Sequence, residues 1–93
     1  MSTELKETFD KAVKLASSPE GGKWSLTTAH KSTMYGCFKK VTVGDVQGER
    51  PGMFSIVARQ KWDAWKDATA LSEEEAMNQY IAVVEQFVPD LKA

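Results

Sequence analysis

The sequence has few of the residues that support metal, disulfide or nucleophilic chemistry. Its 93 residues include one cysteine, Cys37, and one histidine, His30. A single cysteine cannot form an internal disulfide, and these two residues cannot supply the usual ligand set of a metal site. We therefore expect no metal and no cofactor. Covalent catalysis needs a nucleophile beside a base, and no spacing joins these two residues, so an enzyme is the weaker hypothesis.

Long apolar runs are also missing. Charged residues interrupt every apolar stretch, and the N-terminus lacks the apolar core of a signal peptide. We expect a cytoplasmic protein without stable membrane insertion. No glycine-rich phosphate loop of the GxxxxGKS or GxGxxG type is present. The length and the 42% hydrophobic content predict a single domain over residues 1–93.

Net charge is small but unevenly placed. The formal total is −1, yet residues 21–61 contain seven basic and two acidic residues, a local charge of +5 that leaves −6 for the rest. Nucleic-acid-binding domains usually carry a positive excess over the whole domain. The pattern therefore favours a compact anionic ligand, such as a small phosphate-bearing molecule, and argues against nucleic acid.

The hydrophobic pattern predicts four helices. Apolar residues recur at helical spacing in four segments, and no stretch alternates apolar and polar residues as a half-buried strand would. The predicted helices extend over residues 3–16, from 29 to about 43, from Ser55 onwards, and from Ser72 to a break at Pro89. The predicted fold class is all-α, a four-helix domain without a sheet.

Capping residues support these helix starts. Ser2 or Thr3 can cap the first helix, Thr27 or Thr28 the second, and Ser72-Glu-Glu-Glu75 is a capping box for the fourth.

The loop at 43–52 contains three glycines and a proline, and we expect Met53 and Phe54 after it to insert into the core. The third helix is expected to turn Ile56, Ala58, Trp62, Trp65 and Ala68 inward.

The second helix carries an unusual stripe. Lys31, Tyr35, Phe38, Lys39 and Thr42 share one face, so two cations and two aromatic rings lie together. An aromatic face suits a nucleotide base and cations suit its phosphates. The alternative is a solvated row of lysines above half-buried aromatic rings. Next to this stripe, a buried structural role is expected for the cysteine, and a surface position for the histidine.

Two segments resemble one known family. Residues 35–53 read YGCFKKVTVGDVQGERPGM and residues 61–65 read KWDAW. They resemble the acyl-CoA-binding protein family, whose signature is Tyr-x-x-Tyr-Lys-Gln-Ala-Thr-x-Gly-Asp, an Arg-Pro-Gly loop and Lys-Trp-x-Ala-Trp. FDKAV from Phe9 and EAM-x-x-YI from Glu75 also match, so the resemblance extends from about Phe9 to Phe87.

The resemblance implies an up-down-down-up four-helix bundle that binds medium- to long-chain fatty acyl-CoA esters and catalyses no reaction. It implies an intracellular carrier and pool buffer, a monomer that meets acyl-CoA-using enzymes transiently. The implied ligand-binding residues are Tyr35, Phe38, Lys39, Lys61, Tyr80, Ala12 and Val13. Among them, Phe38 matches the ring that stacks on adenine, and Tyr35 and Lys39 match contacts with the nucleotide and its 3′-phosphate. For Trp62 and Trp65, the implied roles are core packing or ligand contact.

The chain departs from the family pattern in three places. Phe38 lacks the hydroxyl of the family tyrosine, and Val57 replaces a lysine for which Arg59 can partly substitute. Ser17 aligns with the helix-one lysine, whose role Lys14 or Lys23 could take. The alternative function is a helical protein-interaction module that has lost ligand binding; the presence of Lys39, Lys61 and Tyr80 argues against it.

Overall fold

The computed structural model describes residues 3–92, which form helices and no strand. Their elements are α1 (Thr3–Ala16), the short 3-10 helix η1 (Gly21–Lys23), α2 (Thr28–Thr42), α3 (Ile56–Thr69) and α4 (Glu73–Glu85). The predicted four-helix, all-α class is confirmed. A cap at Ser2 lies outside the described residues.

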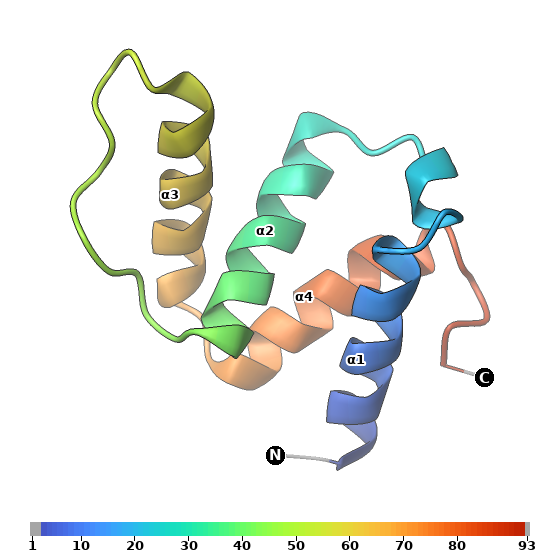
Figure 1. Ribbon diagram of the computed structural model, residues 1–93. Coiled ribbons are helices and arrows are strands. Elements are labelled where there is room, and N and C mark those ends of the chain that lie inside the picture. Colours follow the sequence, from blue (N-terminus) through green and yellow to red (C-terminus); the bar gives the residue numbers. More distant parts are fainter. Residues whose placement is uncertain (1–2, 93) are drawn as a thin grey trace.

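The helices follow the up-down-down-up order. In Figure 1, α1 rises, α2 and α3 both descend, and α4 returns across the molecule. Because α2 and α3 run in the same direction, the loop between them climbs the full length of α3 on the outside. Helix α2 packs on both α3 and α4, and α1 packs on α4. The result is a flat molecule with extents of 43 × 31 × 16 Å.

Helix α4 supplies most of the core. The predicted capping box at its start is present, with Ser72 Oγ accepting from the Glu75 backbone N–H at 3.1 Å. Phe9 and Cys37 from the other helices are almost completely buried against α4, so the prediction of a buried structural thiol is confirmed. No helix within residues 3–92 is both long and apolar enough to cross a membrane.

Helix α4 ends earlier than predicted. Its last residue is Glu85, and not the residue before Pro89. The chain then turns, so that the ring of Phe87 stacks on Trp24 at 5.5 Å and Leu91 reaches the core. These contacts outweigh the helical spacing that continues in the sequence to Val88.

The single histidine takes part in the hydrogen bonds that cap the start of α2. Thr27 is the cap, as predicted: its Oγ1 accepts from the His30 backbone N–H at 3.0 Å, and the His30 Nδ1 accepts from the Thr27 N–H at 3.2 Å. The imidazole also meets the edge of Phe87 at 5.7 Å and is half-buried. His30 is therefore part of the fold, closing the first turn of the helix.

Two core predictions around the start of α3 are wrong. Met53 and Phe54 are exposed, at 68% and 95%, and so are Ile56, at 63%, and Ala58. The inward face of α3 is fixed at Gly36 of α2, where an added Cβ would lie 2.2 Å from the Ala64 carbonyl oxygen. Ala68, one turn after Ala64, is buried at this contact, whereas Ile56, in the first turn of α3, is not.

The two tryptophans of α3 fasten the long loop. Trp62 Nε1 donates to the Gln47 carbonyl at 3.2 Å, and Trp65 Nε1 donates to the Gly44 carbonyl at 2.8 Å. Gly44 has a φ of 110°, a conformation that favours glycine. The half-buried tryptophans thus hold the loop against α3.

Candidate ligand-binding site

Two neighbouring depressions lie on either side of α2. The first, which we call the aromatic groove, has a volume of about 330 Å³. Its lining residues come from α1, α2, α4 and the loop before α2: Val13, Ala16, Ser17, Leu26, Lys31, Met34, Tyr35, Phe38 and Tyr80. Apolar and aromatic side chains predominate, which suits the flat face of a base or another apolar group.

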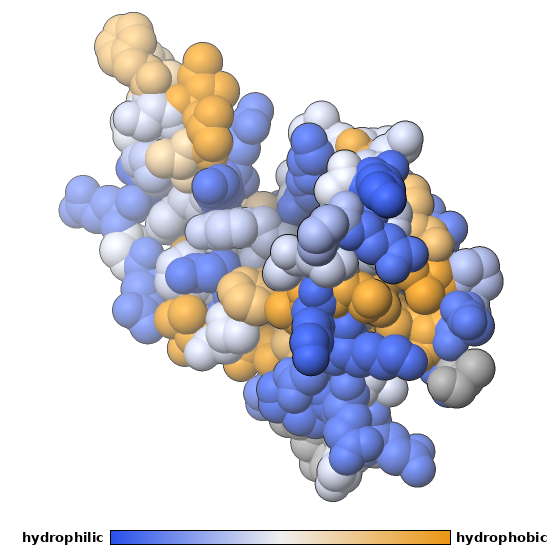
Figure 2. All heavy atoms as spheres, turned by 45° about the vertical axis from the view of Figure 1, so that its right-hand side comes forward, coloured by the Kyte–Doolittle hydropathy of each residue, from blue (hydrophilic) through white to orange (hydrophobic). Residues whose placement is uncertain are grey.

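The second depression, which we call the helix cleft, separates α2 from α3 and has a volume of about 460 Å³. It is lined by Thr28, Lys31, Ser32, Tyr35, Val57, Gln60, Lys61 and Ala64. The notch between the α3 lobe and the rest of the molecule is visible in Figure 2. Lys31 and Tyr35 line both depressions, so the two adjoin at these residues.

A lysine at this junction, Lys61, and one a turn beyond Tyr35 along α2, Lys39, lie over aromatic rings. Lys61 Nζ lies 5.6 Å from the centre of the Tyr35 ring, and Lys39 Nζ lies 4.7 Å from the centre of the Trp65 ring. Within residues 3–92, no carboxylate lies within 4.0 Å of the amines of Lys31, Lys39 or Lys61. By contrast, Lys40 pairs with Asp45 and also donates to the Thr69 carbonyl. The unpaired amines are available to an anion.

The aromatic residues differ in exposure. Phe38 is 37% exposed although its ring is apolar. Tyr80 is buried, with its ring edge-on to Phe9 at 5.2 Å, and this burial raises the pKa of its phenol. Phe38 therefore offers an open ring face at the groove, while Tyr80 forms part of the wall.

The structure brings together most of the predicted site residues. Tyr35, Phe38, Tyr80 and Val13 line the aromatic groove, and Lys61 lines the helix cleft. Lys39 follows Phe38 but lines neither depression. Ala12 is fully buried in the core and also lines neither, so no direct ligand contact is available to it here.

The set of binding residues implied by the family resemblance lacks two residues that line these depressions, Lys31 and Val57. Lys31 lines both depressions; the helix stripe predicted from the sequence includes it, but the set of residues implied by the family resemblance does not. Val57 lines the cleft through a side chain that is 65% exposed. Ser17 lines the aromatic groove, whereas Lys14 and Lys23 do not. The described residues contain no cluster of three His, Cys, Asp or Glu placed to hold a metal.

The fold is a four-helix bundle with two adjoining depressions, and the comparisons with known proteins specify its family. The family model described as acyl CoA binding protein matches residues 6–84. The chain belongs to the acyl-CoA-binding protein family. The prediction made from its helix-two and tryptophan motifs is confirmed.

Two curated relatives match this chain over nearly their full length. The chain is 46% identical to the acyl-CoA-binding protein of Fritillaria agrestis over 87 residues, covering 92% of this chain and 95% of the relative. It is 43% identical to that of Ricinus communis over 90 residues, covering 96% of each.

Solved structures share the fold. The acyl-CoA-binding protein of Moniliophthora perniciosa superimposes with a TM-score of 0.80 at 35% identity, over 100% of this chain and 86% of that one. Acyl-CoA-binding protein 2 of Oryza sativa gives a TM-score of 0.75 at 38% identity, over 92% of each.

Proposed function

We propose that this protein binds medium- to long-chain fatty acyl-CoA esters and acts as their carrier and pool buffer, without catalysing a reaction. The observation that carries the proposal is the junction at Tyr35, where Lys31 and Lys61 have no carboxylate partner among residues 3–92 and two apolar depressions adjoin. An acyl-CoA ester carries groups that match these features: a flat base, a group of phosphates and a long apolar tail. Membership of the acyl-CoA-binding protein family supports the same conclusion.

In this proposal, the adenine stacks on the exposed face of Phe38 in the aromatic groove. The 3′-phosphate is attached close to the base, and in this proposal Lys39, the residue after Phe38, meets it. Lys31 and Lys61 meet the diphosphate at the junction, and the acyl chain follows the helix cleft past Val57. Stacking needs only the ring, so it survives the missing hydroxyl at position 38.

Replacing the head-group lysine tests this arrangement. Lys39→Ala is expected to weaken binding of palmitoyl-CoA and of free CoA by similar factors, roughly ten- to a hundredfold, because a charged hydrogen bond to a phosphate is lost. Isothermal titration calorimetry measures both affinities.

Lys66→Ala is the matched control, since the Lys66 amine lies 5.5 Å from the Trp62 ring and lines neither depression. Equal affinities of Lys39→Ala and the parent protein would remove Lys39 from the site. A parent protein that binds neither CoA nor palmitoyl-CoA would instead favour the helical protein-interaction module.

A further inference from the structure

The helix cleft carries hydrogen-bonding groups in addition to its apolar walls. Most of its lining is apolar, but Thr28, Ser32 and Gln60 add two hydroxyls and one amide. All three residues are exposed, and within residues 3–92 their side chains make no hydrogen bond. These groups are therefore available to whatever occupies the cleft.

Other hydroxyl groups of the helices are already in use. Thr8, Thr42 and Thr69 each donate to the backbone carbonyl four residues earlier, at 2.9, 2.7 and 3.1 Å. Such a bond satisfies the hydroxyl donor inside the helix itself. Ser32, in the second turn of α2, makes no such bond within the described residues, so the cleft differs from the rest of the helical surface.

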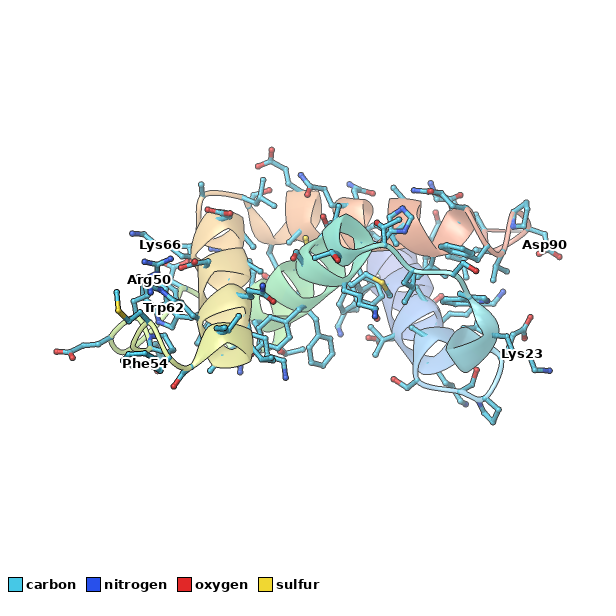
Figure 3. All side chains as sticks on the ribbon, turned by 90° about the horizontal axis from the view of Figure 1, so that it is seen from above. Lys23, Arg50, Phe54, Trp62, Lys66 and Asp90 are labelled. Atoms are coloured by element: carbon cyan, nitrogen blue, oxygen red, sulfur yellow. The ribbon has the colours of Figure 1, made fainter. Side chains whose placement is uncertain are left out.

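A third depression, which we call the side pocket, continues the helix cleft. It has a volume of about 260 Å³ and shares Ser32 and Ala64 with the cleft, so the two adjoin at these residues. Its lining also includes Thr33 of α2, Asp67 of α3 and Gln79 of α4. Figure 3, seen from above, shows α4 starting beside α3 and running past α2 along one side of the molecule, and Gln79 contributes to the pocket from that side.

This lining suits a neutral polar group better than a plain hydrocarbon or a charged group. A saturated chain would cover the hydroxyls and the amide without giving them partners, which costs free energy. The Asp67 carboxylate repels a second carboxylate, and Lys31 and Lys61 at the cleft repel an amine. A hydroxyl carries no charge, and it can both donate to a carboxylate and accept from Ser32 or Gln60.

We propose that this protein prefers fatty acyl chains that carry a hydroxyl group towards their far end, and that Ser32 and Gln60 select them. This inference rests on the proposed binding of acyl-CoA esters and names a narrower ligand class for the same site. The chain follows the helix cleft, and its hydroxyl meets Ser32 where the side pocket begins. The apolar walls still bind the methylenes, while the hydroxyl adds selectivity because the site leaves its polar groups unpaired with any other chain.

Calorimetric titration with 16-hydroxypalmitoyl-CoA and palmitoyl-CoA tests this preference. The parent protein is expected to bind the hydroxylated ester roughly three- to tenfold more tightly, because its hydroxyl pairs with groups that palmitate leaves unpaired. In Ser32→Ala/Gln60→Leu the order is expected to reverse by a similar factor, because the hydroxyl then loses its partners and the cleft becomes more apolar. Hexadecanedioyl-CoA, which ends in a carboxylate, should bind the parent more weakly than the hydroxylated ester.

Ser25→Ala/Gln86→Leu is the matched control, since both residues are exposed and line none of the three depressions. It should keep the selectivity of the parent within about twofold, with the helix content of each variant checked by circular dichroism.

The inference is overturned if the parent binds palmitoyl-CoA or the dicarboxylic ester at least as tightly as the hydroxylated ester. It is also overturned if Ser32→Ala/Gln60→Leu weakens free CoA as much as the hydroxylated ester, because these groups would then bind the CoA arm. In both cases acyl-CoA still binds and the proposed function stands, whereas a parent that binds no acyl-CoA ester overturns both.

Discussion

At the residue scale, the candidate site depends on a few lysines that the fold leaves without carboxylate partners. Lys40 and Lys39 are neighbours in the sequence, yet Lys40 is tied to Asp45 and Lys39 lies over the Trp65 ring. Sequence periodicity placed Lys39 in the helix stripe but could not say which of the two lysines was already neutralised. That difference depends on where the loop after α2 returns, which only the tertiary structure fixes.

Cys37 offers a residue-scale prediction about reactivity. Burial raises the pKa of its thiol to about 11, and its Sγ lies 3.9 Å from Gln79 Oε1. Because the thiolate is the reactive form, we expect the native protein to react with a thiol-specific disulfide reagent at about pH 8 far more slowly than the protein unfolded in concentrated guanidinium chloride. Absorbance of the released thiolate follows both reactions. Equal rates would show that the thiol is accessible in the native state.

At the scale of single elements, the starts of the helices could be predicted from the sequence, but the full set of α3 residues that face the core could not. The Ser72 and Thr27 caps are hydrogen bonds between residues close together in the chain, so the sequence alone is enough to predict them. The inward face of α3 instead depends on the close approach of Ala64 to Gly36, a contact between helices far apart in the sequence. The sequence pattern placed Ala68 inward correctly, but it also placed Ile56 in the core, and that residue is 63% exposed.

Gly36 provides an element-scale test of that close approach. Replacing glycine by alanine inside a helix ordinarily stabilises the helix by roughly 0.5–1 kcal/mol. At this position the new methyl group meets the backbone of Ala64, so Gly36→Ala is expected to destabilise the protein by roughly 1–3 kcal/mol. Urea unfolding followed by circular dichroism measures the free energy of unfolding.

Gly22→Ala is the control, because nothing lies within 4 Å of the Cβ it would add. It should be neutral or slightly stabilising. If Gly36→Ala were as stable as the parent or more so, α2 and α3 would not be in backbone contact at this point.

At the scale of the whole molecule, the basic and the acidic parts of the sequence form different elements of the fold. The +5 segment of residues 21–61 comprises η1, α2, the long loop and the first part of α3, which flank the helix cleft. The acidic remainder includes α4, whose first turn carries three glutamates. Composition located the basic segment, but only the packing of α2 against α3 brings Lys31 and Lys61 to opposite sides of one cleft. The molecule is therefore polarised, with its unpaired cations beside its apolar depressions.

Calorimetric titration of the parent protein with free CoA, octanoyl-CoA and palmitoyl-CoA tests the central claim most directly. Burial of each methylene contributes about 0.8 kcal/mol, so a tail held in the helix cleft should raise affinity at least about tenfold from octanoyl- to palmitoyl-CoA. Free CoA should bind more weakly than both esters, and higher salt should weaken all three because the head group meets lysines. We expect one ligand per protein chain in each titration. Affinities that do not change with chain length, or an absence of binding, would contradict the account.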